Sequence, residues 1–406
     1  MTDFFSGAQQ RYIASNKATL EWMLERPALR GVYLNTKMNP LTLVDYAAVD
    51  GWRGPDHIYG WIQGRGLEAL VTHAAAFAGI DRALSERLDA AGGQLYAALD
   101  ELRARDGHCY FCYDRDMNPV RFEGDWAIPQ NRPADIYTFS DTFVAKGLVA
   151  GAARYAPQDL PRQLDALASV IAAIEDRRFQ IDEKQPLSHA TIAAELEDFG
   201  IRMIMLSAGA LLSGIGRRDL AGFMDRFIAH IIDNHYDPAT GLLRNVSRQD
   251  RCNVGHGIEF VGFALDFLPE GADPALLAVL ERILVASFDL GFKPPGVRLV
   301  VSAATGAVLS PFSPWWTLPE TIRASALANA RSGSAQTLRI WQQADEVFFR
   351  GYWRGSAGIA YQCLTEAGPL DYVPATPDLD PGYHTGLSLL AAIDVVTRRQ
   401  TSDIPE

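Results

Sequence analysis

The sequence is poor in features that mark several common protein classes. It holds four cysteines in 406 residues, too few for the disulfide framework of a small secreted protein. Acidic residues outnumber basic ones by 49 to 37, which gives a formal net charge of −12. An excess of negative charge disfavours nucleic acid and anionic membrane surfaces as partners.

Long hydrophobic runs are also lacking. The longest uncharged apolar run covers residues 203–216, whereas a membrane-spanning helix needs about 20 residues. The first residues, MTDFFSGAQQR, carry an acid and lack the basic and apolar regions of a secretory signal. We therefore expect a cytoplasmic protein with neither a nucleic-acid nor a membrane partner.

Several catalytic and metal-binding motifs are absent. The sequence has no P-loop, no GxGxxG after a strand and no GxSxG nucleophile elbow, which disfavours phosphoryl transfer, Rossmann redox chemistry and serine hydrolysis. It also lacks HExxH and histidine-rich clusters, so we expect no metal and no cofactor. Cys109 and Cys112 have a metal or redox spacing, but no second CxxC follows. We interpret both as structural, because positions i and i+3 of an extended segment face opposite ways.

Helical periodicity, by contrast, recurs from end to end. Hydrophobic residues make up 48% of the chain and charged residues 21%, a composition typical of a globular core. Segments that are apolar nearly all round alternate with amphipathic ones, a pattern that favours an inner and an outer ring of helices. Twelve helices are predicted, at residues 7–27, 64–79, 83–105, 137–155, 159–177, 192–213, 217–235, 255–267, 274–289, 317–331, 334–350 and 381–398.

Extended segments with turn signals interrupt the helices. Each has a polar or glycine turn between β-prone runs and is predicted to form a hairpin. They precede the fourth, eighth, tenth and twelfth predicted helices. The simplest fold is all-α, an (α/α)6 barrel with short β-hairpins at its mouth, formed by residues 1–406 as a single domain. Two separate helical domains are the alternative. The hairpin segments are residues 109–122, 236–246, 297–310 and 358–373.

Residues suited to proton transfer and sugar binding lie near the N-termini of even-numbered predicted helices. In a barrel whose even helices form the inner ring, these ends converge on one mouth. The coincidence of location favours one functional site built from four distant segments. The residues are Arg65 in WIQGR, His256 and Glu259 in NVGHGIEF, Trp315, Trp316 and Glu320 in PWWTLPE, and Tyr383 and His384 in PGYH.

The stretch CNVGHGIEF combines a histidine with two glycines at the start of an apolar helix. A helix N-terminus carries partial positive charge, which favours a neutral imidazole able to accept a proton. His256 and Glu259 are three residues apart, so they share a helix face. We expect Gly255 and Gly257 to leave room for a ligand at the imidazole. The neighbouring tryptophan pair offers a flat apolar surface on which a sugar ring can stack.

Each candidate also has a purely structural interpretation. A lone histidine is more often a structural hydrogen-bonding residue than a catalyst. Glu320 could only stabilise the first turn of its helix, and Arg65 could only pair with Glu68. The remaining histidines receive lesser roles: His230 and His235 as surface or C-terminal residues, and His57 and His189 as weaker candidates in loops.

These motifs resemble the N-acylglucosamine 2-epimerase family, whose relatives include cellobiose 2-epimerases and aldose–ketose isomerases acting on mannose. The resemblance covers nearly the whole chain and is specific at WIQGR, at NVS followed by NVGHGIEF, at PWWTLPE and at PGYH. It implies an (α/α)6 barrel, a small-molecule sugar substrate and catalysis without a cofactor. Dimerisation is common in the family, so a homodimer is an expected form.

The resemblance also implies a mechanism that uses two bases. His256 and His384 match the family's catalytic histidines on opposite faces of the sugar. One removes the C2 proton to give an enediolate, and the other returns a proton to the opposite face, or to C1 in isomerases. Arg65 would steady the carbonyl or enediolate oxygen. Glu259 and Glu320 would bind hydroxyls and tune the histidines, and Trp315, Trp316 and Tyr383 would complete the substrate site.

The chain departs from the family pattern at three places. Leu387 stands where many members carry arginine, Glu68 stands where tryptophan is common, and RMIMLSAGALL lacks the histidine of an MHxxEA motif. These positions fall where substrate choice is expected to be set, and the missing histidine slightly favours an epimerase. The alternatives are a glycoside-processing barrel with Glu259 and Glu320 as acid and base, and a non-catalytic relative that binds carbohydrate or protein.

Overall fold

The computed structural model of the chain describes residues 2–372 and 375–402. Most of these residues are helical, and short strands connect the helices. The chain folds as two compact units. The first unit comprises Met1–Ala18, Glu197–Pro374 and His384–Glu406, and the second comprises Thr19–Leu196 and Ala375–Tyr383. The ends of the predicted domain 1–406 and residue 373 of the last predicted hairpin lie outside the described residues.

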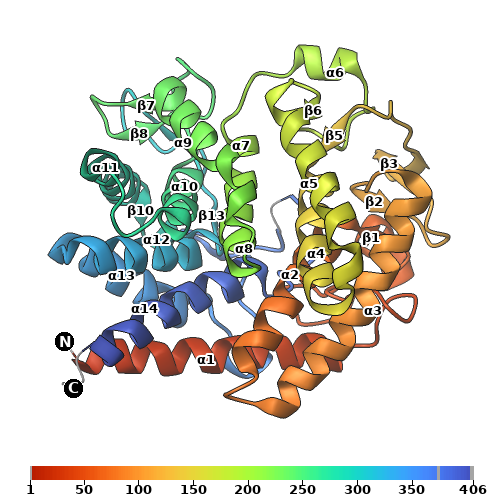
Figure 1. Cartoon of the computed structure of the whole chain (residues 1–406), viewed down its shortest axis with the longest axis horizontal. Helices are drawn as coiled ribbons and strands as arrows, with labels where there is room; N and C mark the ends of the chain where they lie inside the picture. The colour runs from red at the N-terminus through yellow and green to blue at the C-terminus, as the bar shows by residue number, and fades with distance from the viewer. Residues whose placement is uncertain (1, 373–374, 403–406) are drawn as a thin grey trace. The chain divides into compact units, whose positions relative to one another are not determined.

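In the second unit, a buried helix is packed between more exposed ones. The helix α4 is buried along almost its whole length, whereas α3 and α5 each expose a charged face, as their sequence patterns predict. The backbones of α2 and α4 approach closely, because a Cβ on Gly64 would lie 2.6 Å from the backbone of Phe143. The helices are α2 (Gly60–Phe77), α3 (Arg82–Asp106), α4 (Phe139–Tyr155), α5 (Leu160–Glu175) and the short α6 (His189–Ala194) (Figure 1).

The strands of the second unit form small sheets beside the N-termini of α2 and α4. An antiparallel sheet has the order β1-β2-β3-β4, and β5 pairs in parallel with β6. Cys109 and Cys112 are buried here with free thiols, and burial raises the pKa of the Cys112 thiol to about 12. Both properties agree with a structural role. The strands are β1 (Ile58–Tyr59), β2 (Cys112–Tyr113), β3 (Pro119–Glu123), β4 (Trp126–Pro129), β5 (Tyr137–Thr138) and β6 (Phe179–Gln180).

The first unit repeats the alternation of buried and amphipathic helices. Helix α10 packs against α12, which in turn packs against α14, while α11 and α13 cover them. Helix α1 (Thr2–Glu25) joins this packing at Tyr12, whose hydroxyl accepts a hydrogen bond from Trp341 Nε1 at 2.8 Å. The other helices are α7 (Gly200–Leu206), α8 (Ala208–Gly214), α9 (Gly222–His235), α10 (Val254–Phe267), α11 (Pro274–Gly291), α12 (Thr317–Ser332), α13 (Ala335–Val347) and α14 (Ser388–Ser402) (Figure 1).

Short antiparallel pairings in the first unit confirm the predicted hairpins at 236–246 and 358–373, within the described residues. The 297–310 segment also pairs with itself, through an antiparallel bridge between Val301 and Val308, and its strand β12 pairs in addition with β9 from another segment. The strands are β7 (Tyr236–Asp237), β8 (Leu242–Leu243), β9 (Arg251–Cys252), β10 (Phe292–Lys293), β11 (Gly296–Val297), β12 (Val301–Ser302), β13 (Ser313–Pro314), β14 (Cys363–Thr365) and β15 (Gly368–Pro369).

The predicted helix at 192–213 is interrupted near its start, between α6 and α7. Residues 195–199 are not helical, because this segment pairs instead with the chain before β9. Phe199 N donates to Asn245 O at 3.1 Å, and Asp198 forms a bridge with Val246. Helix α7 begins only at Gly200, where the Asp198 side chain accepts a hydrogen bond from the Gly200 backbone N–H at 2.7 Å.

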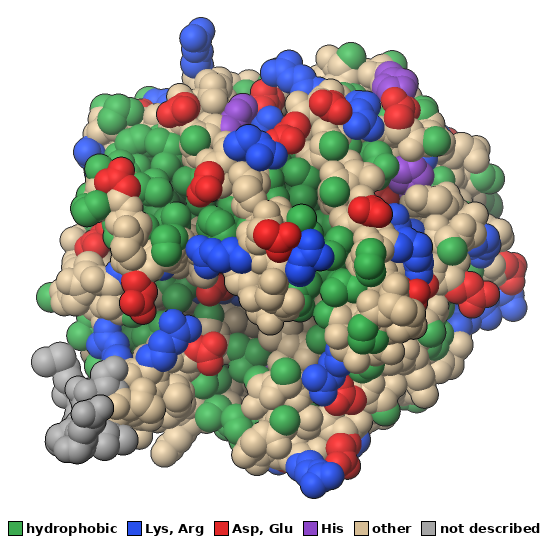
Figure 2. Space-filling model, in the orientation of Figure 1, with side chains coloured by type: hydrophobic (Ala, Val, Ile, Leu, Met, Phe, Trp, Pro, Cys, Tyr) green, Lys and Arg blue, Asp and Glu red, His purple; other side chains and the backbone are tan. Residues whose placement is uncertain are grey.

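The last predicted helix, at 381–398, begins instead with a π-helical turn over Tyr383–Leu387 that leads into α14. Such turns are rare and occur frequently at functional sites. None of the described helices is both long enough and apolar enough to cross a membrane. On the face drawn in Figure 2, acidic and basic side chains are interspersed rather than gathered into patches of one sign.

Candidate functional site

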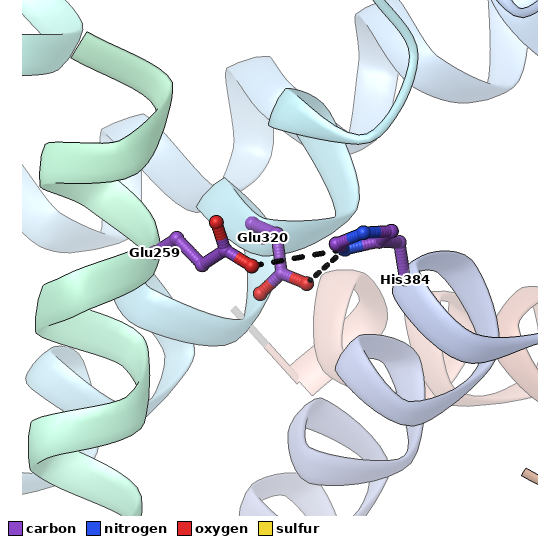
Figure 3. Close-up of side chains that lie close together, drawn as sticks. All are labelled: Glu259, Glu320 and His384. Carbon is purple, nitrogen blue, oxygen red and sulfur yellow. Dashed lines mark hydrogen bonds and ion pairs between the residues drawn. The ribbon is translucent and has the colours of Figure 1, made fainter. Parts of the chain in front are cut away.

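Two glutamates and a histidine meet at the N-terminal ends of α10, α12 and the π-helical turn. His384 Nδ1 lies 3.1 Å from Glu320 Oε1 and 3.8 Å from Glu259 Oε1. Glu259 comes from the second turn of α10 and Glu320 from the first turn of α12, and both carboxylates point toward the same imidazole (Figure 3). All three side chains are buried. The structure therefore brings together three of the predicted site residues.

The charge state of Glu320 determines which nitrogen of His384 is free for chemistry. Burial opposes ionisation of Glu320, but Arg323 and the hydrogen bond with His384 hold the pKa of this carboxyl below its usual value. Arg323 Nη1 lies 3.2 Å from Glu320 Oε2. An ionised Glu320 accepts the hydrogen bond, so Nδ1 of His384 carries a proton and Nε2 is left to exchange one.

His256 lies in the first turn of α10, one turn before Glu259 on the same helix. The side chain of Asn253 accepts a hydrogen bond from the His256 backbone N–H at 3.1 Å, which fixes the start of the helix. Burial lowers the pKa of His256, the Asp198 carboxylate raises it in part, and His384 lowers it further. The imidazole is therefore neutral at physiological pH and able to accept a proton.

Trp316 packs against both histidines. Its ring centroid lies 5.6 Å from that of His256 and 5.8 Å from that of His384, with a tilt of 36° in each case. Trp315 meets His384 edge-on at 6.2 Å. Both tryptophans are buried, so the Trp316 indole holds the two imidazoles at a set separation. Its predicted use as a stacking surface for a sugar stays a prediction.

The two glycines around His256 have a different purpose from the predicted one. A Cβ on Gly255 would lie 2.7 Å from Trp316 Cη2, and a Cβ on Gly257 would lie 2.9 Å from Ser287 Oγ of α11. Protein atoms thus fill the space that was expected to receive a ligand. Gly255 is needed because the tryptophan must reach the imidazole, and Gly257 allows α10 and α11 to pack closely.

Glu259, Glu320 and His384 also meet the geometric requirement for holding a metal ion. One ligand atom from each lies within 4.8 Å of the others, and three protein ligands are typical of a catalytic zinc site. However, the Arg323 guanidinium already neutralises Glu320, and a divalent cation beside it would meet a like charge. The contacts fit proton transfer better than metal binding, and the expectation of no metal stays a prediction.

The predicted site residues of the second unit gather around Arg65. The Arg65 guanidinium carbon lies 4.0 Å from the ring centroid of Phe143, 5.1 Å from that of Trp61 and 5.5 Å from that of Tyr383. Aromatic faces attract a cation, so this cage fixes the position of the guanidinium. The structure thus places Arg65 with Tyr383, while their predicted convergence with His256 stays a prediction.

Glu68, which stands where family members commonly have tryptophan, forms a buried ion pair. Its Oε2 lies 3.0 Å from Nζ of Lys146, and that ammonium donates to the Tyr383 hydroxyl at 2.6 Å. Burial opposes the charge on Lys146, but Glu68 and Tyr383 raise its pKa above the usual value. Glu68, one of the predicted departures from the family pattern, therefore supplies the negative charge that pairs with the buried Lys146.

Glu183 is a buried acid that no sequence motif singles out. Its Oε1 accepts hydrogen bonds from Trp61 Nε1 and from the Ser140 backbone N–H, the latter at 3.1 Å. Burial raises the pKa of this carboxyl to about 7, although these hydrogen bonds oppose the shift. Because Trp61 forms one wall of the Arg65 cage, Glu183 helps to hold that cage.

The substitution Glu183→Gln should stabilise the protein at alkaline pH. A carboxyl with a raised pKa binds its proton more tightly in the folded state, so stability falls as pH rises from about 4.5 to about 7. A shift of this size corresponds to about 3 kcal/mol. Glutamine keeps the acceptor oxygen but carries no charge. In urea unfolding, the variant should exceed wild type by about 2–3 kcal/mol at pH 8 and by little at pH 5. An equal difference at both pH values would contradict the assignment.

The other histidines have structural contacts. His235 is the last residue of α9, which agrees with the predicted C-terminal position, but its side chain is buried and its Nδ1 lies 2.9 Å from Arg244 O. His230 is half-buried and lies 3.0 Å from Glu197. The weaker candidates His57 and His189 contact Gly51 O at 3.1 Å and Asp135 at 3.2 Å, respectively.

Sequence reasoning missed Arg323, Lys146, Asp198 and Glu183. Two of them left a signal. Arg323 follows Glu320 by three residues and so shares its helix face, and Lys146 is a lone cation in the apolar run FVAKGLV. Asp198 and Glu183 lie in polar loops whose sequence carries no comparable signal.

The fold is similar to those of several carbohydrate-active enzymes whose structures have been solved. A cellobiose 2-epimerase from Bacillus thermoamylovorans B4167 matches with a TM-score of 0.73 and 15% sequence identity, covering 97% of this chain and 100% of that one. A D-mannose isomerase matches with a TM-score of 0.71 and 10% identity, covering 95% and 97%. An alpha-mannanase from Bacteroides thetaiotaomicron matches with a TM-score of 0.55 and 13% identity, covering 97% of both chains.

No protein-family model and no curated protein sequence matches the chain. The structural matches confirm the predicted resemblance at the level of the fold, which is mainly helical and follows that of the sugar epimerases along nearly the whole chain. The similarity to carbohydrate enzymes therefore rests on architecture, and the chemistry must be argued from the side chains of this chain.

Proposed function

We propose that the protein is a sugar 2-epimerase or aldose–ketose isomerase that works by acid–base proton transfer without a cofactor. The observation that carries the proposal is the pair His256 and His384, which pack against one indole and have different environments. One imidazole is kept neutral by burial, and the other is hydrogen-bonded to an ionised carboxylate. An acid and a base with distinct environments are what proton transfer at a carbon requires.

The reaction starts from the open-chain aldose. Neutral His256 takes the proton from C2, and the electron pair of the C–H bond moves into an enediolate whose charge rests on the C1 oxygen. His384, stabilised as an imidazolium by Glu320, returns a proton to the opposite face of C2, which gives the epimer. In the isomerase outcome, the hydroxyl proton on the C2 oxygen first moves to the C1 oxygen, so that the negative charge rests on the C2 oxygen, and delivery of the His384 proton to C1 then gives the ketose. In the reverse direction, the two histidines exchange roles.

Arg65 is the group proposed to stabilise the enediolate oxygen. The cage of aromatic rings holds its charge in a fixed position, which is the preorganisation that transition-state stabilisation needs. Glu259 and Tyr383 are proposed to bind sugar hydroxyls. The whole chain is proposed to form one (α/α)6 barrel, because the fold matches cover nearly all of the chain and of the matched epimerase.

A deuterium-exchange screen tests this function. The purified protein is incubated in D2O with a panel of free aldoses, ketoses and N-acyl sugars, and deuterium at C1 and C2 is followed by NMR. We expect incorporation at C2 for an epimerase, and at C1 or C2 for an isomerase, in a substrate that also yields product. The absence of exchange across the whole panel would refute the proposal.

The glycoside-hydrolase alternative finds less support. Paired carboxyl groups in glycosidases stand about 5–9.5 Å apart with the sugar between them. Here the nearest carboxylate oxygens of Glu259 and Glu320 lie within 4.8 Å of each other, and both face the imidazole of His384. Release of reducing ends from oligosaccharides that survives replacement of both histidines would favour the hydrolase. Tight sugar binding without turnover would favour a carbohydrate-binding protein.

A further inference from the structure

We propose that Asp198 is a positioning residue for His256: it builds the loop that supports the imidazole and places a negative charge beside it. The inference rests on the proposed function for its kinetic consequence, but its structural part concerns His256 alone. No feature of the sequence pointed to Asp198, which lies in the polar stretch ELEDFG.

The Asp198 carboxylate connects three segments around His256. Its Oδ1 accepts from the Gly200 backbone N–H at 2.7 Å, and its Oδ2 accepts from Asn245 Nδ2 at 3.0 Å. The carbonyl oxygen of the Asn245 side chain in turn accepts from the Asn253 backbone N–H. Asn253 caps α10 through the His256 backbone N–H. A continuous series of hydrogen bonds therefore runs from Asp198 to the first turn that carries His256.

The same carboxylate lies close to the His256 ring. A Cβ on Gly200 would be 2.9 Å from Asp198 Oδ1 and 3.6 Å from His256 Nδ1, so both atoms border the same small space. His256 Nδ1 is buried and has no hydrogen-bond partner among the described residues. When Nε2 accepts a proton from substrate, the imidazolium charge develops beside this carboxylate, which stabilises it.

Burial and His384 lower the pKa of His256, whereas the Asp198 carboxylate raises it. Removing the Asp198 charge should therefore lower the pKa of His256 and weaken it as a base. The other charged groups nearby are engaged with one another: Arg202 and His230 with Glu197, and Glu259, Glu320 and Arg323 with one another or with His384.

The substitution Asp198→Asn tests the proposal, because asparagine keeps the size and an acceptor oxygen without the charge. The Cε1–H signal of His256 is followed by NMR against pH and assigned from the spectrum of His256→Asn. We expect the titration midpoint to fall by about one pH unit. On the substrate found by the exchange screen, the acid limb of the kcat profile should move the same way, and kcat should fall about tenfold.

Glu197→Gln is the matched control. It removes the negative charge of the residue directly before Asp198, and that carboxylate contacts Arg202 and His230. Its His256 midpoint should equal that of wild type. If Asp198→Asn does not fold, Asp198→Ser serves instead, because serine can still accept from Gly200. An unchanged midpoint in a folded Asp198 variant, or an equal shift in Glu197→Gln, would overturn the proposal. The NMR result does not depend on turnover, so it stands apart from a failure of the proposed function.

Discussion

Replacing either His256 or His384 with asparagine should lower the rate of sugar interconversion by about 10²–10⁴-fold, the range that general acid–base groups contribute. In the proposed mechanism, each histidine moves a proton that the other cannot reach from its own face of the substrate. Asparagine preserves polarity and approximate size but cannot take up a proton. Initial rates of product formation by NMR measure the effect, on the substrate with the fastest deuterium exchange.

His189→Asn is the control for this pair. His189 is exposed and its ring lies 3.2 Å from the exposed Asp135 carboxylate, so its replacement should leave the rate within twofold of wild type. Near-UV circular dichroism should show that all three variants are folded. A rate near that of wild type in either His256→Asn or His384→Asn would contradict the two-base mechanism.

Replacing Lys146 with methionine should destabilise the protein by about 3–5 kcal/mol, the cost of leaving a buried partner charge uncompensated. Lys146 is fully buried, and Glu68 and Tyr383 both depend on its ammonium. Methionine fills a similar volume, so the lost charge rather than a cavity should account for the effect. Urea denaturation at pH 7 gives the free energy of unfolding.

The double variant Lys146→Met with Glu68→Leu should recover most of the lost stability, because an apolar pair of similar volume can replace a buried ion pair. Arg82→Met is the matched control in the same unit. The pair of Arg82 with Glu86 spans 2.8 Å but is exposed, so its loss should cost less than about 1 kcal/mol. A cost for Lys146→Met no larger than that for Arg82→Met would show that the buried pair is unimportant.

Much of the helical architecture could be predicted from local periodicity. Helix α10 and α12 are found at their expected positions, because their caps and apolar faces are encoded within a few residues. The segment before α7 could not be predicted in this way. Leu196 and Phe199 have helical spacing, but Asp198 contacts Asn245 and Val246, and these contacts between distant parts of the chain interrupt the helix. Such tertiary contacts override helix propensity.

The site was predictable in its residue types but not in its internal contacts. The sequence indicated His256, Glu259, Glu320 and His384, and the first unit brings them together. It could not show that the glycine at 255 serves the tryptophan rather than a ligand. Nor could it show which glutamate bonds to His384, since side-chain contacts between helices depend on how those helices pack.

The most direct test of the central claim is a half-reaction experiment with the two histidine variants. Each is incubated in D2O with each member of the C2 epimer pair separately, and loss of the C2 proton is followed by NMR. The two-base mechanism predicts that His256→Asn and His384→Asn each retain exchange with one epimer only, and that the epimer differs between them. Exchange of the same epimer by both variants, or of both epimers by either one, would contradict it.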